Sequence, residues 1–572
     1  MTSVSPRSFR NDPHGFLPQA LAGFVASHPD AVWNPAGYIS RRTPVVDVNG
    51  RPAVAVISGG GSGHEPMHAG FLGAGMLAAA VPGLMFTSPN AVQVTEATRA
   101  ADAGRGVVHV VKNYTGDVIN FRVARQGLPE VETREVIVAD DVATTSDSGP
   151  GRRGTGATIL IEKIAGASAY RGDDVDEVTR LARVAAENSR SMAAALTPGH
   201  LPTSGRYTFD LGEGEMEVGV GIHGEAGVER TGVTSAHETV ARLAGAVVDD
   251  LGLGEGDRVL CLVNGLGATT NLELDLVFDE VLRHLADRRI SVARSIVGSY
   301  VTSVNMAGVS VTLTRLDDAD GDTLVELMDA PTAAPAWPVT LGVDPTPADA
   351  TMVVPEDVPG TADSAVNQWL TDFVAGVTAA VDDLTELDRL AGDGDFGTNM
   401  EAAFGDLPTP VKGTDGEVLA ALGSRLFIRA GGTSGAVFGT MFREMATTAA
   451  QGASATAAQG ASAALTAGEL AEALTRAADA VTELGGAKPG DRTMVDALVP
   501  AAEAARAVAA ADPDAAPDLA AVHTAAIAGA RSTAKITASK GRASYLGERA
   551  RGVIDPGALV VAWLFGGAGK MD

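Results

Sequence analysis

The sequence predicts a protein of two fold classes: a two-lobed α/β region at the N-terminus and an all-α helical barrel at the C-terminus. Over residues 1–330, short apolar runs, the first of which ends in glycines, alternate with helical patterns, as in sheets covered by helices. From residue 363 onward, apolar residues recur at the i, i+3, i+4 and i+7 spacing of an amphipathic helix. A stretch rich in proline, alanine and threonine separates the two regions.

The α/β region contains several short runs that we expect to be strands, at 53–57, 106–111, 135–139, 258–263 and 309–313. Because helical patterns lie between them, mostly parallel sheets are expected. The segment from 200 to 258 is a candidate boundary between the two lobes. The resulting domain prediction is a first domain over 1–330, a linker over 331–362 and a helical domain over 363–572, with Ser364 as a candidate cap of its first helix.

Composition excludes several classes of protein. With 71 Asp plus Glu against 43 Lys plus Arg, the formal charge is −28, and a field of that sign repels nucleic acid. The single cysteine, Cys261, excludes an intrachain disulfide framework and a cysteine-based zinc site. The N-terminus lacks the apolar core of a signal peptide, and no stretch of about 18 apolar residues suggests a membrane helix. We therefore expect a cytoplasmic protein that binds neither nucleic acid nor a membrane.

Three polar clusters in the first region could carry chemistry. The sequence ISGGGSGHEPMH over 57–68 ends a predicted strand in three glycines, so that the backbone could approach a ligand, and His64 could donate to an oxygen there. In KNYTGD over 112–117, Asp117 could accept a substrate hydroxyl proton at the end of a strand. In GVGIHGE over 219–225, His223 could act as a nucleophile toward a carbonyl carbon. A tight turn, a helix cap and a half-buried ring are the respective structural alternatives.

The strongest local signal lies in the second region, in LDRLAGDGDFGTN over 387–399. Its three carboxylates, Asp388, Asp393 and Asp395, repel one another unless a cation neutralises them, and hard oxygen ligands suit Mg²⁺. A solvated acidic turn is the alternative. The GGTSG sequence over 431–435 could cradle phosphates at a helix start.

Together these motifs resemble the single-chain, ATP-dependent dihydroxyacetone kinase family. The resemblance spans nearly the whole chain, through GGGSGHEPMH, KNYTGD, GRRG at 151–154, GIHGE, NGLGAT, GDGD, KPGD-TM and GRASYLGER in order. It implies that residues 1–330 bind the ketose and that His223 holds it covalently as a hemiaminal. It also implies that Gly61, His64, Lys112 and Asp117 bind the substrate, with Asp117 taking the proton from the attacking hydroxyl.

For the helical half, the resemblance implies a nucleotide domain, a closed barrel of about eight helices. Asp388, Asp393 and Asp395 would hold Mg²⁺ against the phosphates of ATP, which is the expected donor. The family's ketose domains pair as dimers, so a homodimer is expected. The positions that match the family's nucleotide pocket are Asn399, Gly432, Ser434, Thr493, Met494, Arg549 and Asp555.

Two positions depart from the family's pattern. Phe396 stands where a histidine is common after the second aspartate of GDGD, and Ile428-Arg429 stands where small or hydroxyl residues are usual. We hypothesise that Arg429 supplies the positive charge near the phosphates that the histidine would have contributed.

Dihydroxyacetone is the leading substrate, with D- or L-erythrulose as the alternative. Two other classes of function stay open. One is an FAD-AMP lyase (cyclising) activity that uses the same aspartates, and the other is a regulatory module that binds a ketose without transferring phosphate.

Overall fold

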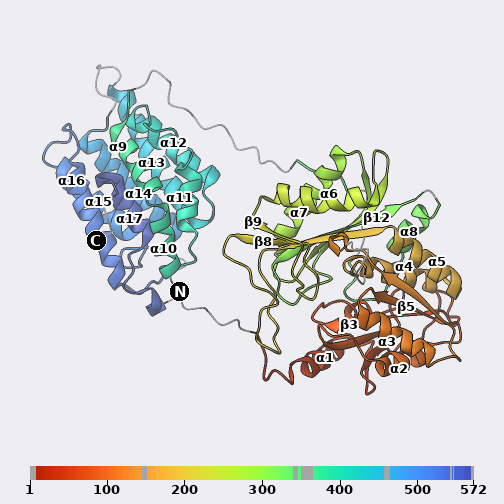
Figure 1. Ribbon diagram of the computed structural model, residues 1–572. Helices are drawn as coiled ribbons and strands as arrows, with labels where there is room; N and C mark the ends of the chain where they lie inside the picture. Colours follow the sequence, from red (N-terminus) through yellow and green to blue (C-terminus); the bar gives the residue numbers. More distant parts are fainter. Residues whose placement is uncertain are drawn as a thin grey trace. The chain divides into compact units, whose positions relative to one another are not determined.

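The computed structural model describes residues 8–144, 151–317, 319–338, 345–349, 365–456, 464–540, 544 and 547–568. The chain divides into two compact units, Met1–Asp349 and Ala350–Asp572. Each unit has its own hydrophobic core, and the two are described separately below. The predicted fold class is confirmed, because the first unit is α/β with two sheets and the second is helical (Figure 1).

The first sheet carries the glycine-rich motif. It has six strands in the order β1-β2-β4-β3-β5-β6, and the four strands β4, β3, β5 and β6 run parallel to one another as expected. The antiparallel pair β1 and β2 closes one edge, with β2 antiparallel to β4. The strands are β1 Ala31–Asn34, β2 Tyr38–Arg41, β3 Ala55–Ser62, β4 Ala79–Met85, β5 Val107–Lys112 and β6 Thr133–Val138.

The second sheet differs from the expectation of parallel strands. Its order is β11-β10-β12-β7-β8-β9, and only β10 with β11 is parallel. Two of the antiparallel pairs, β7 with β8 and β8 with β9, join consecutive strands that need no helical crossover. Residues 200–258 do not separate the lobes, since they supply β8, β9 and a covering helix. The strands are β7 Ser189–Ala195, β8 Glu215–Val218, β9 Glu229–Gly232, β10 Arg258–Gly265, β11 Ser291–Gly298 and β12 Gly308–Leu316.

The helix α4 joins the two sheets. It contacts strands of both, and its residues from Ala157 to Ala169 are all buried, so it is covered on every face, including the face that carries Glu162 and Lys163. The helices α2 and α3 cover the first sheet, and α6 and α7 cover the second. The helices of this unit are α1 Phe16–Ser27, α2 Ala91–Ala101, α3 Thr115–Gln126, α4 Ala157–Arg171, α5 Val175–Glu187, α6 Ala236–Leu251, α7 Asn271–Asp287 and α8 Gly321–Asp329.

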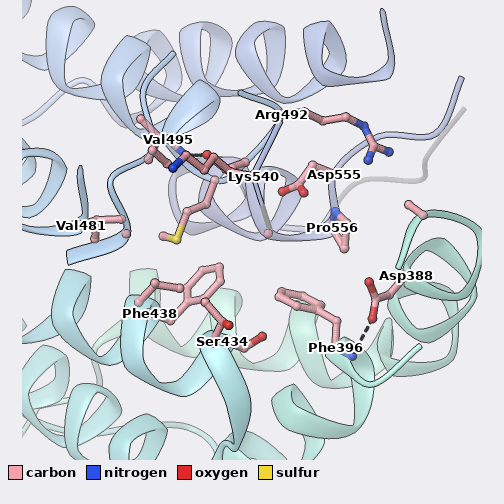
Figure 2. Close-up of a pocket in the computed structure, with 18 of the residues that line it drawn as sticks. Asp388, Phe396, Ser434, Phe438, Val481, Arg492, Val495, Lys540, Asp555 and Pro556 are labelled. Atoms are coloured by element: carbon pink, nitrogen blue, oxygen red, sulfur yellow. Dashed lines mark hydrogen bonds between the residues drawn. The ribbon is translucent and has the colours of Figure 1, made fainter. Parts of the chain in front are cut away.

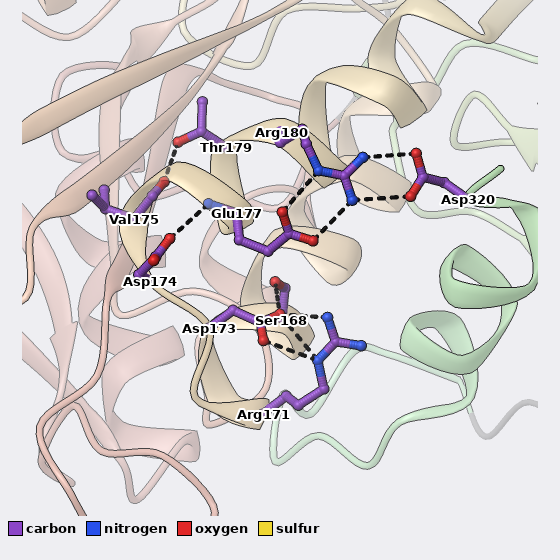
Figure 3. Close-up of polar contacts among 9 residues, drawn as sticks. All are labelled: Ser168, Arg171, Asp173, Asp174, Val175, Glu177, Thr179, Arg180 and Asp320. Atoms are coloured by element: carbon purple, nitrogen blue, oxygen red, sulfur yellow. Dashed lines mark hydrogen bonds and ion pairs between the residues drawn. The ribbon is translucent and has the colours of Figure 1, made fainter.

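The turn from α4 to α5 is fixed by charged groups (Figure 3). Arg171 contacts Asp173 in the turn, and Asp174 caps α5 by accepting from the backbone N–H of Glu177. On α5, Arg180 donates to both carboxylate oxygens of Asp320, the residue that precedes α8, at 2.7 and 2.9 Å. This two-bond contact joins α5 to the start of α8.

Residues 331–338, which the sequence assigns to the linker, pack on the first unit. The backbone N–H groups of Ala333 and Ala336 donate to the carbonyls of Ala74 and Gly70. The buried Trp337 ring contacts Phe71 at a centroid distance of 6.2 Å, so this stretch adds to the core.

The second unit packs its helices around α17. The ten residues from Pro556 to Phe565 of α17 are all buried, which makes it the central helix of the unit. No helix among the described residues is long and apolar enough to cross a membrane. The helices are α9 Gln368–Ala379, α10 Val381–Ala391, α11 Phe396–Phe404, α12 Asp415–Arg429, α13 Gly432–Thr456, α14 Ala467–Gly485, α15 Val495–Ala509, α16 Leu519–Ser532 and α17 Pro556–Gly566.

The start of the helical unit differs from the predicted cap. Helix α9 begins at Gln368 because the Asn367 side chain accepts a hydrogen bond from the backbone N–H of Leu370 at 3.0 Å. Ser364 lies outside the described residues. The predicted apolar stripe extends over two helices, because the helix is interrupted at Ala380, which ends α9 and precedes α10.

Candidate active site

The glycine-rich motif forms the end of β3, where every residue from Gly59 to Ser62 is buried. A Cβ atom at Gly61 would lie 2.6 Å from the backbone nitrogen of Thr87, and one at Gly60 would lie 2.1 Å from Nζ of Lys112. Glycine is therefore required here by close approach of neighbouring groups, and the backbone of Gly61 is kept free of side-chain cover.

His64 follows this turn and is fully buried. Its Nδ1 lies 2.8 Å from the carbonyl oxygen of Thr302 and donates to it, and its Nε2 has no hydrogen-bond partner. Burial and the neighbouring His223 hold the pKa of His64 well below its usual value, so the ring is neutral. Nε2 therefore presents a lone pair and can act only as a hydrogen-bond acceptor, where the sequence suggested a donor.

His223 lies half-buried in a pocket of aromatic rings. The ring centroids of Tyr114, His64 and Phe86 lie 4.4, 4.7 and 5.5 Å from its own, all edge to face. Its Nδ1 is 3.3 Å from Oε1 of Glu225, and its backbone N–H donates to Oε2 of the same carboxylate at 3.0 Å. Because Glu225 accepts the hydrogen on Nδ1, the lone pair is left on Nε2, which is the form a nucleophile requires.

Arg153, from the GRRG motif, holds the loop that carries His223. Its guanidinium donates to Asp141 at 2.6 Å and to the carbonyl oxygen of Gly219 at 2.8 Å. A Cβ atom at Gly221 would lie 2.0 Å from Oε2 of Glu225 and 2.6 Å from Nη1 of Arg153, so a larger residue there would displace these side chains. The motif thus connects the first sheet to the histidine loop.

Lys112 and Asp117 lie side by side at the carboxyl end of β5 and in the first turn of α3. Both are buried; Nζ of Lys112 donates to the carbonyl oxygen of Gly59 at 3.1 Å and lies 3.8 Å from Oδ2 of Asp117. The other oxygen of Asp117, Oδ1, has no hydrogen-bond partner. Asp117 does not cap α3, whose N-cap residue is Tyr114, so its carboxylate is left to face Lys112.

In the second unit, the three predicted aspartates meet between α10 and α11. One carboxylate oxygen from each of Asp388, Asp393 and Asp395 lies within 4.8 Å of the others. The backbone N–H groups of Gly394 and Phe396 donate to Oδ2 of Asp388 at 2.9 and 3.2 Å. Burial, together with the other two carboxylates, raises the pKa of Asp388. Three acceptor-only carboxylates that repel one another fit a hard divalent cation such as Mg²⁺.

A cavity of about 200 Å³ opens beside these aspartates (Figure 2). Ser434, Thr493, Met494 and Asp555 of the predicted nucleotide set line it. Asn399 lies nearby and accepts from the backbone N–H of Gly431, next to Gly432. The side chain of Arg549 lies outside the described residues.

The sequence analysis missed two cations of this cavity, Arg492 and Lys540. Arg492 is buried, and its Nη2 donates to the carbonyl oxygens of Ala550 and Val553, both at 2.9 Å. The signal for Arg492 was present, because it stands inside the KPGDRTM motif. Lys540 had only its place before the GRASYLGER motif to mark it.

Arg429 occupies a different place from the one we hypothesised. Its Nη1 donates to Oδ2 of Asp406 at 2.6 Å, and Arg425 contacts the same carboxylate. Arg429 is not among the residues that line the cavity. Phe396 does line it, and its ring contacts that of Phe438 at a centroid distance of 5.9 Å, so an apolar wall stands where a histidine is common.

Comparison with known protein families identifies a domain in each unit. Residues 22–336 match the Dak1 domain, and residues 390–570 match the DAK2 domain. This chain belongs to the dihydroxyacetone kinase family. It carries the family's two domains fused in one polypeptide, as the motifs predicted.

Relatives within the dihydroxyacetone kinase family match over nearly their whole length. Triokinase/FMN cyclase of Rattus norvegicus is 36% identical over 587 residues, covering 98% of both chains. L-erythrulose 1-kinase of Mycolicibacterium smegmatis is 36% identical over 584 residues, again with 98% of both chains covered. Among solved structures, the dihydroxyacetone kinase of C. freundii in complex with AMP-PNP and Mg²⁺ is 29% identical, with 98% of both chains covered and a TM-score of 0.61.

Proposed function

We propose that this dihydroxyacetone kinase family member transfers the γ-phosphoryl group of ATP to a hydroxyl of a short ketose that His223 holds covalently. Dihydroxyacetone is the leading candidate for this ketose. The observation that carries the proposal is the set of atoms around His223. A histidine with its lone pair on Nε2 lies against the ring of His64, whose buried Nε2 is unpartnered, and Asp117, in the same cluster, has an unpartnered buried oxygen. Buried polar atoms without partners are costly and are typical of a ligand site.

The proposed chemistry follows from these atoms. Nε2 of His223 forms a bond to the carbonyl carbon of the ketose as the π bond of the carbonyl breaks, and the oxygen takes up a proton from water. The Nδ1 hydrogen of His223 passes to the carboxylate of Glu225, so that the product is a neutral hemiaminal. His64 accepts a hydrogen bond from a hydroxyl of the bound ketose, and the backbone of Gly61 borders the site. Asp117 then takes the proton of the reacting hydroxyl, whose oxygen attacks the γ-phosphorus as ADP leaves. A polyol such as glycerol has no carbonyl carbon for His223 and is excluded.

In the helical unit, Asp388, Asp393 and Asp395 would hold Mg²⁺, and Ser434, Thr493, Met494 and Asp555 line the nucleotide cavity. When bound, Mg²⁺ neutralises the phosphate charge that builds up during transfer. Arg492 and Lys540 add positive charge to a cavity that is otherwise acidic. Asn399, Gly432 and Arg549 complete the proposed nucleotide set.

The substrate could also be a four-carbon ketose. One relative is named an L-erythrulose 1-kinase and another a triokinase/FMN cyclase, and both are 36% identical to this chain. An FAD-AMP lyase activity would use the aspartates but not His223. The domain boundaries, a homodimer and a cytoplasmic location stay predictions; sedimentation of the active enzyme tests the dimer.

The decisive experiment is a coupled ADP-release assay with Mg²⁺-ATP. It compares dihydroxyacetone, D-erythrulose, L-erythrulose and glycerol, for the wild type and for His223→Ala. We expect turnover of at least one ketose, none of glycerol, and loss of ketose turnover in His223→Ala. Ketose turnover that survives His223→Ala would contradict the covalent role, and cyclic FMN formation from FAD in both proteins would favour the lyase.

A further inference from the structure

Behind the glycine-rich turn lies a row of buried polar groups that links Lys112 to two residues with no part in the proposed reaction. It consists of Lys112 on β5, His68 at the end of the ISGGGSGHEPMH motif, and Glu162 on α4. The Lys112 and Glu162 side chains are fully buried, and His68 is 6% exposed. Nε2 of His68 lies 2.7 Å from Nζ of Lys112, and Nδ1 of His68 lies 2.5 Å from Oε1 of Glu162.

The direction of these hydrogen bonds can be assigned from chemistry. An ionised carboxylate only accepts, so Nδ1 of His68 donates to Glu162. Burial and the adjacent Lys112 lower the pKa of His68, so the ring is neutral and its Nε2 accepts. Lys112 therefore donates to Nε2 of His68 as well as to the carbonyl oxygen of Gly59.

These contacts leave one hydrogen of the Lys112 ammonium available for a further interaction. An ammonium has three hydrogens, and two are directed to Gly59 and His68. The third is left for the side of Asp117, whose Oδ2 lies 3.8 Å away, and Oδ1 of Asp117 has no partner. Without His68, the flexible four-carbon stem of Lys112 could place its charge elsewhere.

We propose that His68 and Glu162 are positioning residues of the ketose site, which hold Lys112 so that it binds one oxygen of Asp117 and leaves the other for the substrate hydroxyl. This inference rests on the proposed function. The structure of the motif supports it, because a Cβ atom at Gly60 would lie 2.1 Å from Nζ of Lys112 and 3.3 Å from Nε2 of His68. Gly60, the middle one of the three successive glycines, thus makes room for this contact.

A purely structural role is the competing interpretation, since His68 also links the turn to α4. The two are separated by comparing His68→Leu with His68→Gln. Leucine fills the space but offers no hydrogen bond, whereas glutamine can accept from Lys112 and donate to Glu162. His109→Leu is the matched control, because His109 is another fully buried histidine and lies on β5, the strand that carries Lys112. Its Nε2 lies 3.0 Å from Oγ1 of Thr98, and its ring contacts Phe121 rather than the site.

The first arm measures kcat and KM for the ketose and for ATP in the full-length enzyme. We expect His68→Leu to lower kcat/KM for the ketose by roughly 10- to 100-fold with KM for ATP unchanged, as misplacement of a reacting group does. His68→Gln should recover most of this loss. His109→Leu should lower the melting temperature but keep kcat/KM within about twofold of the wild type, since no reacting group contacts it.

The second arm measures the pH dependence of kcat/KM with Glu162→Gln. Burial lowers the pKa of Lys112, and the charges of Asp117 on α3 and Glu162 on α4 raise it. The neutral His68 and His64 are the other titratable groups around it. Removing the Glu162 charge lowers the pKa of Lys112 further, so activity should be lost at a lower pH on the alkaline side than in the wild type.

These outcomes separate the inference from the proposed function. If the wild type phosphorylates a ketose but His68→Leu and His109→Leu have equal effects on kcat/KM, or the alkaline limb of Glu162→Gln does not move, the positioning role is wrong and the kinase stands. If the wild type phosphorylates no ketose, the proposed function fails before the variants are compared.

Discussion

The two histidines of the ketose site differ in the hydrogen bonds made by their Nδ1 atoms. Nδ1 of His64 donates to a backbone carbonyl deep in the core, and Nδ1 of His223 faces a carboxylate at the surface of its loop. Both bonds leave Nε2 without a hydrogen, but the ring of His64 is fully buried and that of His223 is half-buried. We therefore propose that His64 serves as a hydrogen-bond acceptor and that the more exposed His223 serves as the nucleophile.

At the same scale, Asp555 combines a structural and a functional role. It caps α17, because its Oδ1 accepts from the backbone N–H of Ala558 at 2.8 Å, and it lines the nucleotide cavity. Burial raises the pKa of Asp555 from 3.8 to about 6. The folded protein therefore binds this proton more tightly than the unfolded chain, so folding stability is lost as pH rises from about 4 to about 6.

We predict that Asp555→Asn stabilises the protein at pH 7.5 by about 1–3 kcal/mol while lowering kinase activity. Asparagine keeps the cap and removes the buried charge. Urea unfolding at pH 7.5 and 4.5 measures this, and the gain should shrink at the lower pH. The control is Asp518→Asn, an exposed N-cap of α16, which should change stability little at either pH. A gain in Asp555→Asn that does not depend on pH would contradict the assignment.

At the scale of elements, β3 is a strand whose function requires the absence of side chains. Its last four residues are buried without adding apolar side-chain area, so this end of the strand contributes little to the hydrophobic core. The strand is instead held by parallel neighbours on both sides and by contacts of α4 from one face. This arrangement lets backbone and polar groups from three elements meet at the ketose site.

We predict that Gly60→Ala lowers kcat/KM for the ketose by at least tenfold and destabilises the protein by about 1–3 kcal/mol, the usual cost of overpacking. The added methyl group would displace the Lys112 ammonium from Gly59 and His68. The matched control is Gly23→Ala in α1, where a Cβ atom meets nothing within 4 Å. It should stabilise by about 0.5–1 kcal/mol and leave activity unchanged. Full activity in Gly60→Ala would show that Lys112 is not held where we place it.

At the scale of the whole molecule, the proposed sites for the two substrates belong to two units with separate cores. The proposed ketose residues all belong to Met1–Asp349, and the three aspartates and the proposed nucleotide cavity belong to Ala350–Asp572. Each ligand should therefore stabilise the unit that binds it.

We predict two thermal transitions in scanning calorimetry, each moved by one ligand. A non-hydrolysable ATP analogue with Mg²⁺ should raise the transition of the helical unit by about 5–10 °C at 100 times Kd, and a chelator should reverse the shift. Dihydroxyacetone should raise the other transition. Asp388→Asn should abolish the first shift and His223→Ala the second. One transition moved equally by both ligands would mean that the units unfold together.

The fold class and most of the site residues could be predicted because their signals are local. Short apolar runs correctly predicted β3, β5, β6, β10 and β12. The LDRLAGDGDFGTN sequence predicted a carboxylate cluster, and its three aspartates stand close together in the chain. Short segments of chain decide such features, so the residues that specify them stand together in the sequence.

Tertiary structure alone decided what depends on distant segments. The antiparallel second sheet, the pairing of Arg429 with Asp406, and the contact of His68 with Glu162 join residues far apart in the chain. Hydrogen-bond direction at His64 depends on Thr302, which lies 238 residues away. The sequence by itself determined which chemical groups this protein carries, whereas packing of the two sheets around α4 decided which atoms of those groups are left free to react, because a buried donor or acceptor takes its partner from whatever the fold brings within reach.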